Sequence, residues 1–111
     1  MTITQARRFL KLIDAVEEFP AENFDKTSFR RGDCRCPGGI ACDLFRPFRW
    51  VSGVPSIKFR MGARALDDFF GTEENNYFWG IMFELKGDWC ARANEYLERK
   101  LDELGYKIVP A

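Results

Sequence analysis

Apolar side chains at spacings of three and four residues mark a helix near the start of the chain. Between positions 3 and 19 the apolar residues share one helical face, and charged residues occupy the opposite face. Thr2 and Gln5 fit a capping box at the first turn. Pro20 ends the pattern, because proline cannot continue a helix. The sequence therefore predicts an amphipathic helix over residues 3–19.

The same spacing predicts a second long helix towards the other end of the sequence. Asp88 is its predicted N-cap, and Gly105 closes it. The inner stripe of this helix consists of Cys90, Ala93, Leu97, Leu101 and Leu104. Residues 106–109 form an apolar tail that we expect to dock on the core.

Shorter and more varied signals separate the two long helices. Residues 20–39 are predicted to form a loop that ends at Gly38 and Gly39. A short helix is expected to follow, from Ile40 to about Phe45. The two glycines therefore precede this helix in the predicted structure.

The next stretch combines backbone breakers with an alternating pattern. Residues 46–55 are predicted to be irregular, because Pro47, Gly53 and Pro55 interrupt regular structure. Apolar and basic residues then alternate over positions 57–61, which is typical of a strand.

Helical spacing returns after this strand. It begins at Ala63 and ends at Phe70, with Gly71 as the predicted C-cap. Thr72 is expected to cap another short helix. Residues 77–83 are apolar except for one glycine, so we expect them to be buried.

Together these patterns predict a mainly α fold in a single domain over residues 1–111. The expected domain is compact and has about five helical segments. It includes a minor short strand pair formed by residues 57–61 and 106–109. An α+β arrangement is the alternative.

Composition changes this picture mainly by excluding functions. Eleven Phe, three Trp and three Tyr among 111 residues supply a large core and argue against disorder. No apolar run reaches the roughly 20 residues that span a bilayer, and no signal peptide pattern is present. We therefore expect a cytoplasmic protein without a membrane partner. The chain has no histidine, which excludes Ser-His-Asp and Cys-His catalysis.

Charge is balanced over the whole chain but segregated along it. The formal net charge is zero, with 17 basic and 17 acidic side chains. Residues 26–64 carry nine basic and two acidic side chains, a net charge of +7. The two flanks carry the excess of acidic residues. This pattern predicts either internal ion pairing with the acidic C-terminal helix or the recognition of an acidic partner.

The four cysteines are candidate zinc ligands. Cys34, Cys36, Cys42 and Cys90 could supply four thiolates to one ion. Their spacing differs from the usual pair of Cys-x2-Cys knuckles, and Cys90 lies on a helical stripe, where a thiol packs as a small hydrophobe. Free thiols are therefore the favoured interpretation, and zinc is the alternative cofactor.

Gly38 and Gly39 suggest an anion site at the start of the short helix. Their backbone N–H groups would lie at a helix N-terminus, where the dipole favours negative charge. Cys42 would then have a lowered pKa in the same field, which is the basis of a cysteine-nucleophile hypothesis. The alternative is a turn in which glycine allows close backbone packing.

Arginines and aromatic rings are interleaved over residues 45–50. The guanidinium groups suit phosphate or carboxylate, and exposed rings could stack on bases or anchor a protein partner. The alternative is that Phe45, Phe48 and Trp50 belong to the core. The exposure of these three rings distinguishes an interface from a scaffold.

Several motifs resemble those of a group of small uncharacterised bacterial and phage proteins. The matching residues are Phe24-Asp25-x-x-x-Phe29, then Cys34, then Gly38-Gly39-Ile40-Ala41. The family reads Phe-Asp-Met-x-x-Trp, followed by Cys-Gly-Thr-x-x-Cys-x-Ala-Gly-x-Ala. Residues 69–74 are similar to the Leu-Gly-Leu-Thr-type helix junction of these proteins.

The cysteine pattern of that family is not reproduced here. Cys34 matches the first family cysteine, Gly39 stands in place of the second, and Cys42 stands in place of a glycine. The resemblance implies a compact, mostly helical protein of bacterial or phage origin, and it implies no established activity.

The sequence therefore favours binding over catalysis. We expect a non-enzymatic regulatory or interaction protein that binds an acidic protein partner through residues 30–64. The predicted partner-binding or anion-binding residues are Arg30, Arg31, Arg35, Gly38, Gly39, Arg46, Arg49, Trp50, Lys58 and Arg60. The alternatives are a nucleic-acid-binding protein that uses the same segment and a small zinc-stabilised module. The sequence leaves the oligomeric state open, a homo-oligomer included.

Overall fold

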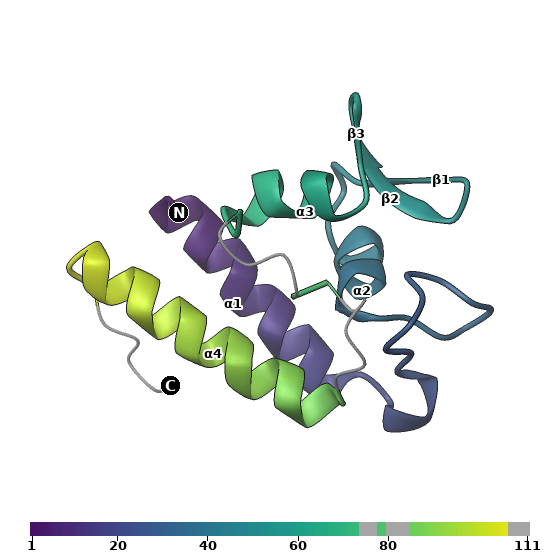
Figure 1. Cartoon of the computed structure of the whole chain (residues 1–111), viewed down its shortest axis with the longest axis horizontal. Coiled ribbons are helices and arrows are strands. Elements are labelled where there is room, and N and C mark those ends of the chain that lie inside the picture. Colours follow the sequence, from purple (N-terminus) through teal and green to yellow (C-terminus); the bar gives the residue numbers. More distant parts are fainter. Residues whose placement is uncertain (74–77, 80–84, 107–111) are drawn as a thin grey trace.

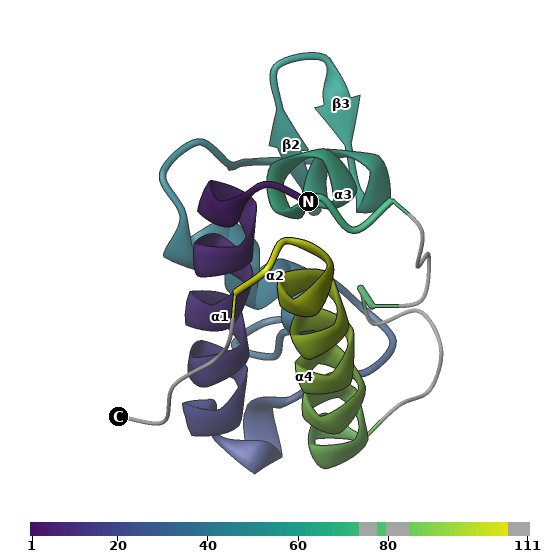
Figure 2. The ribbon, with the colours of Figure 1, turned by 90° about the vertical axis from the view of Figure 1, so that its left-hand side faces the viewer.

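Two long antiparallel helices form one side of the molecule (Figures 1 and 2). The computed structural model describes residues 1–73, 78–79 and 85–106. Helix α1 spans Ile3–Glu18 and begins with the predicted capping box, in which Gln5 N donates to Thr2 Oγ1 and Thr2 N donates to Gln5 Oε1. Helix α4 spans Lys86–Glu103. Both predicted long helices are therefore confirmed.

The predicted start of α4 is wrong by one turn. Leu85 is the N-cap, and Asp88 lies inside the first turn, where its charge still favours the positive end of the helix dipole. The side chain of Lys86, at the start of α4, contacts the C-terminal end of α1. Its Nζ donates to the carbonyl oxygens of Glu17 (3.0 Å) and Phe19 (2.9 Å), so it satisfies carbonyls at the C-terminal end of α1.

An aromatic cluster fills the core between these helices. The ring of Phe9 on α1 lies at its centre and is fully buried. Five other rings surround it at centroid distances of 5.5–6.2 Å, namely Phe70, Phe78, Trp79, Trp89 and Tyr96. Phe78 and Trp79 are completely buried, as predicted, and the remaining residues of 77–83 lie outside the described residues. Leu104 is exposed rather than part of the inner stripe, because it is the C-cap beyond the last turn of α4.

Helix α2 (Pro37–Leu44) begins earlier than the glycines suggested. Pro37 occupies the first helical position, where its missing N–H costs nothing and its fixed φ suits the helix. Gly38 and Gly39 therefore lie within the first turn instead of before it. The prediction of a helix from Ile40 to about Phe45 was too short at its start.

A three-stranded antiparallel sheet follows, in the order β1-β2-β3. The strands are β1 (Arg49–Val51), β2 (Val54–Ile57) and β3 (Arg60–Met61). Ser52 and Gly53 connect the first two, and both have positive φ, at 51° and 75°. Such a pair is typical of the tight turns that match the twist of a hairpin. The expectation that residues 46–55 are irregular is therefore wrong for residues 49–51 and 54–55, which form strands, and holds for residues 46–48.

The predicted strand over residues 57–61 is broken by a second hairpin turn. Ile57 pairs with Arg60, so Lys58 and Phe59 form the turn between β2 and β3. The sheet pairs residues 54–57 with their sequence neighbours, because short hairpins cost little loop-closure entropy. Of the predicted partner strand over residues 106–109, positions 107–109 lie outside the described residues.

Helix α3 (Ala63–Phe70) and its C-cap confirm the prediction for this stretch. Gly71 has a φ of 70°, the left-handed conformation that glycine adopts most readily. The side chain of Thr72 is buried, and its Oγ1 donates to Asp67 Oδ1 at 2.8 Å. The short helix expected after Thr72 falls largely on positions outside the described residues.

A short 3-10 turn, η1 (Ala21–Asn23), leads from α1 into the loop before α2. Isolated bridges from Phe24 to Arg35 and from Arg31 to Cys34 hold this loop in place. The described residues thus form four α-helices and one small sheet around one shared hydrophobic core. The fold is the α+β alternative rather than a purely helical domain. None of the described helices has the length and apolar character needed to cross a membrane.

Candidate functional site

Arg35 is a structural arginine rather than a free partner-binding group. Its Nη1 donates to the carbonyl oxygens of Gly32 (2.6 Å) and Cys34 (2.8 Å), and its Nε donates to Asp43 Oδ2 at 2.9 Å. The side chain is only 16% exposed. The two carbonyl bonds hold the loop together, and the bond to Asp43 connects the loop to α2.

Asp43 joins this arginine to Trp50. Its Oδ1 accepts a hydrogen bond from Trp50 Nε1 at 2.8 Å, while its Oδ2 accepts from Arg35. The guanidinium carbons of Arg30 and Arg35 lie 5.2 Å and 5.6 Å from the centre of the Trp50 indole, within the range of cation–π attraction. One carboxylate of α2 therefore holds the loop and strand β1 together.

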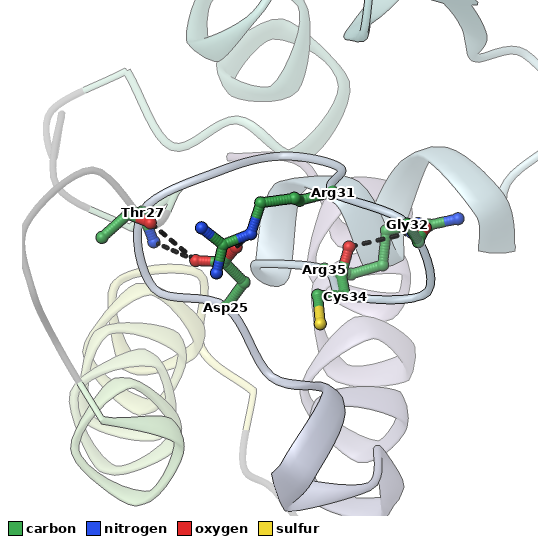
Figure 3. Close-up of polar contacts among 6 residues, drawn as sticks. All are labelled: Asp25, Thr27, Arg31, Gly32, Cys34 and Arg35. Carbon is green, nitrogen blue, oxygen red and sulfur yellow. Dashed lines mark hydrogen bonds and ion pairs between the residues drawn. The ribbon is translucent and has the colours of Figure 1, made fainter.

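Arg31 lies above a second carboxylate in the same loop, as Figure 3 shows. Its Nε is 3.3 Å from Asp25 Oδ2, and Asp25 Oδ1 accepts from Thr27 N (2.8 Å) and Thr27 Oγ1 (2.7 Å). Burial by itself would raise the pKa of Asp25, but the Thr27 hydrogen bonds and the Arg31 charge outweigh burial and hold the pKa below its ordinary value. Arg31 remains mostly exposed, so we expect this ion pair to contribute little to stability.

Gly38 and Gly39 are buried and pack against Phe29. A Cβ atom on Gly39 would overlap the carbonyl oxygen of Phe29, and a Cβ on Gly38 would lie 2.7 Å from the Phe29 ring. The structure therefore contains a close backbone contact at these glycines, and no open anion-binding turn. This outcome corresponds to the close-packing alternative.

The buried thiols do not have the lowered pKa that the nucleophile hypothesis requires. Burial raises the pKa of Cys36, Cys42 and Cys90, each to about 11, so the predicted lowering at Cys42 is wrong. The Sγ of Cys36 donates to the carbonyl of Trp79 at 3.3 Å, and Cys34 is half-buried. Within the part of the chain that the structure describes, no three His, Cys, Asp or Glu side chains group so as to hold a metal ion. The four candidate zinc ligands are thus free cysteines without an assembled site among these residues.

The rings of residues 45–50 belong mostly to the core. Phe48 is buried, and its ring lies 4.9 Å from that of Phe69 on α3. Phe45 packs on the same ring at 5.0 Å, and Trp50 is half-buried against the core. These contacts make Phe45 and Phe48 scaffold residues, and they leave neither ring free to stack on a base or a partner.

Other cations of the basic segment face solvent. Arg30, Arg46, Arg49 and Lys58 are exposed, and none of them forms an ion pair with the described residues. The segment pairs internally through Arg31, Arg35 and Arg60, whose partners are Asp25, Asp43 and Asp68. None of these carboxylates lies on α4. The expected pairing with the acidic C-terminal helix is therefore absent from the ion pairs among the described residues.

A groove lies between α1, the β2–β3 turn and α3. Its volume is about 400 Å³, and its lining comprises Arg8 of α1, residues 57–60 of the hairpin, and Ala65, Asp68 and Phe69 of α3. Sequence reasoning missed Arg8, Phe59, Asp68 and Phe69 as members of a site, because only the fold brings the three elements together. The alternating pattern placed Phe59 on the apolar face of a strand, whereas the hairpin turn leaves its side chain fully exposed.

Comparison of the chain with protein-family models, with curated proteins and with solved structures finds no match. The class of protein is therefore set by the fold alone, a small α+β domain. The resemblance to small bacterial and phage proteins stays a prediction from sequence motifs.

Proposed function

We propose that the chain is a small non-enzymatic interaction protein that binds an acidic protein partner through the sheet side of its basic segment. The observation that carries this proposal is a set of exposed cations that form no ion pair with the described residues, Arg30, Arg46, Arg49 and Lys58. Excess positive charge on one part of a molecule with zero net charge favours an acidic surface by electrostatic complementarity.

The position of these cations relative to the sheet supports the same proposal. Arg49 lies in β1, and Arg46 lies in the connection that leads to it. Arg30 contacts the ring of Trp50, also in β1, and Lys58 forms part of the β2–β3 turn. Arg49 and Lys58 therefore belong to the sheet and its turn, and Arg46 and Arg30 lie next to β1.

The structure favours a protein partner over nucleic acid. Binding to single strands depends on aromatic rings that stack on exposed bases. Phe48 is buried and Phe45 packs on the core, so the segment offers few rings for stacking. Basic nucleic-acid-binding domains also carry a clear net positive charge, and this chain carries none.

Fluorescence anisotropy with a labelled polyglutamate peptide tests the proposal. We expect binding at low salt, a loss of affinity as salt rises, and an affinity reduced about tenfold or more by a combined Arg46→Glu and Arg49→Glu variant. Arg7→Glu is the control, because Arg7 is an exposed cation that belongs to α1 and to neither the sheet nor the residues that line the groove.

Two results would contradict the proposal. An equal effect of the Arg7 control and the sheet variant would show that only overall charge matters. Tighter binding to a random DNA or RNA duplex than to the peptide would favour the nucleic-acid alternative. The zinc alternative has its own measurement, metal analysis of the purified protein, for which about one zinc per chain is the positive result.

A further inference from the structure

We propose that the groove between α1, the β2–β3 turn and α3 binds a bulky apolar side chain that lies within an acidic peptide of the partner. This proposal rests on the proposed function, because it names the feature of the acidic partner that this side of the molecule recognises. The groove volume of about 400 Å³ lies within the range of roughly 300–1,000 Å³ that is usual for ligand sites.

The inner wall of the groove is apolar. Ala65 and Phe69 are buried residues of α3, and Ile57 of β2 packs against the same core. These side chains offer no hydrogen-bond partner to a polar ligand. The apolar surface that a ligand can reach belongs to the half-buried Ile57 and the exposed Phe59, and it favours an aromatic or large aliphatic side chain. The polar groups of the groove lie on the other lining residues, where they can meet the backbone or charges that flank such a side chain.

The charges of the groove favour carboxylates. Its lining has three cations, Arg8, Lys58 and Arg60, against one carboxylate, Asp68. Arg60 Nη1 already forms an ion pair with Asp68 Oδ2, so these two charges neutralise each other. Arg8 and Lys58 remain as the net positive charge of two, which matches acidic residues on either side of an apolar one.

Arg8 is held in place before any ligand arrives. Its Nη1 donates to the carbonyl oxygen of Phe69 at 3.1 Å, and its guanidinium carbon lies 4.2 Å from the centre of the Phe69 ring. The hydrogen bonds among the described residues engage only this one nitrogen, so Nε and Nη2 keep their donor capacity. A preorganised guanidinium loses little side-chain entropy when it binds a carboxylate.

The turn that borders the groove has two features that do not help the free protein fold. Lys58 has a φ of 54°, in the left-handed region that favours glycine. Phe59, the next residue, has a fully exposed ring in the free protein. Strained backbone positions cluster at ligand-binding sites, and the exposed ring beside this one borders the groove. A ligand in the groove would cover the ring of Phe59 from the adjacent side.

Three labelled peptides test the proposal by fluorescence anisotropy. The first is a short run of glutamates with a central phenylalanine, the second has serine in place of the phenylalanine, and the third keeps the phenylalanine but has glutamine in place of every glutamate. We expect the first peptide to bind about tenfold more tightly than the second, which corresponds to about 1.4 kcal/mol. The third should bind more weakly than the first by a similar factor.

Two variants assign this effect to the groove. Phe59→Ser should remove the difference between the first and second peptides and leave the affinity for the second unchanged, because Phe59 contacts only the apolar side chain. Lys58→Gly should weaken the binding of both acidic peptides while its melting temperature stays equal or rises by a few degrees, since glycine relieves the left-handed strain. A loss of affinity without a loss of stability excludes misfolding as its cause.

The failures of the two proposals are distinguishable. Equal binding of the phenylalanine and serine acidic peptides would overturn the groove proposal and leave the proposed function standing. Equal binding of the first and third peptides would overturn the acidic requirement in both proposals. If none of the three peptides binds, both proposals are overturned.

Discussion

Residues 25–43 and residues 46–61 are both rich in arginine, and the structure uses the two stretches differently. In the first, Arg31 and Arg35 are paired with Asp25 and Asp43. In the second, Arg46, Arg49 and Lys58 are exposed and have no ion pair with the described residues, while Arg60 pairs with Asp68 of α3. We call the first stretch the paired loop and the second the basic arm.

The difference between them teaches that local charge density does not identify an interface. The paired loop has three of the four cysteines, the glycine pair Gly38 and Gly39, and three arginines, so its sequence drew attention first. Two of its three arginines have internal partners, because hydrogen bonds of Arg35 and Asp43 close the loop on α2 and β1 and Arg31 pairs with Asp25. The basic arm has fewer distinctive residues, but the short hairpins leave its cations in solvent and one of its aromatic rings uncovered.

The largest expected effect is at the glycines of the paired loop. Gly39→Ala should lower the free energy of unfolding by about 3 kcal/mol or more, because its Cβ would overlap the backbone oxygen of Phe29. Gly38→Ala should cost less, since its Cβ would meet side-chain atoms of Phe29 and Leu66, which can shift. Urea unfolding followed by circular dichroism measures both.

Gly87→Ala is the matched control for these glycine variants. Gly87 lies in the first turn of α4, and a Cβ there meets no atom within 4 Å. Alanine should therefore stabilise the protein by about 0.5 kcal/mol through helix propensity. Equal stability of the Gly39→Ala variant and the wild type would show that the close contact with Phe29 does not exist.

The next largest effect concerns the carboxylate that joins the paired loop to the sheet. Asp43→Ala removes the acceptor for both Arg35 Nε and Trp50 Nε1, and we expect a loss of about 1–2 kcal/mol of stability. Asp33→Ala is the control, because Asp33 is exposed and should change stability by less than about 0.5 kcal/mol. Tryptophan fluorescence should change in the Asp43→Ala variant, because Trp50 loses its hydrogen-bond acceptor, and it should not change in the Asp33→Ala variant.

Two buried carboxylates should respond to pH with opposite signs. The folded-state pKa of Asp25 is lowered, so its contribution to stability is present above the ordinary pKa of about 3.9 and is lost as pH falls through the folded pKa. Burial raises the pKa of Asp67, with the charge of Asp68 adding to this effect although Trp79 and Thr72 donate to its carboxylate. Its contribution is therefore present below the ordinary pKa and is lost as pH rises through the folded pKa.

Asparagine variants separate these two effects in stability measured from pH 3 to pH 7. Asp25→Asn should flatten the loss of stability at acid pH and should weaken the protein most near neutral pH. Asp67→Asn keeps an oxygen that can accept from Trp79 Nε1 and Thr72 Oγ1, so it should cost little or stabilise the protein at pH 7. Parallel pH profiles for the two variants would contradict the assigned directions.

The smallest effect is expected in the basic arm. Arg46→Ala and Arg49→Ala should each change the free energy of unfolding by less than about 0.5 kcal/mol, because neither side chain has an ion pair with the described residues. Urea unfolding followed by circular dichroism, as for the glycine variants and the Asp43 variant, gives this value. A loss of more than about 1 kcal/mol of stability in either variant would show that the arginine has a stabilising internal interaction. It would also remove the contrast with the paired loop.

Predictions from the sequence succeeded where the signal is local. The period of apolar residues, the Thr2–Gln5 capping box and the C-cap at Gly71 specify helices without reference to the rest of the chain, and the structure confirms them. Predictions were less accurate where two signals compete. Pro37 can begin a helix as well as precede one, and the alternation over residues 57–61 fits a hairpin turn as well as a straight strand.

The amino-acid sequence by itself determined the long helices, the aromatic composition of the core and the excess of basic residues in the middle of the chain. Only the tertiary structure decided which of those cations form internal ion pairs. Such pairs join residues of segments that meet after folding, as Arg60 of β3 and Asp68 of α3 do. It also decided the groove, whose lining comes from α1, the β2–β3 turn and α3. Periodicity reports which face of one element is apolar, and it has no information about which other element will lie beside that face.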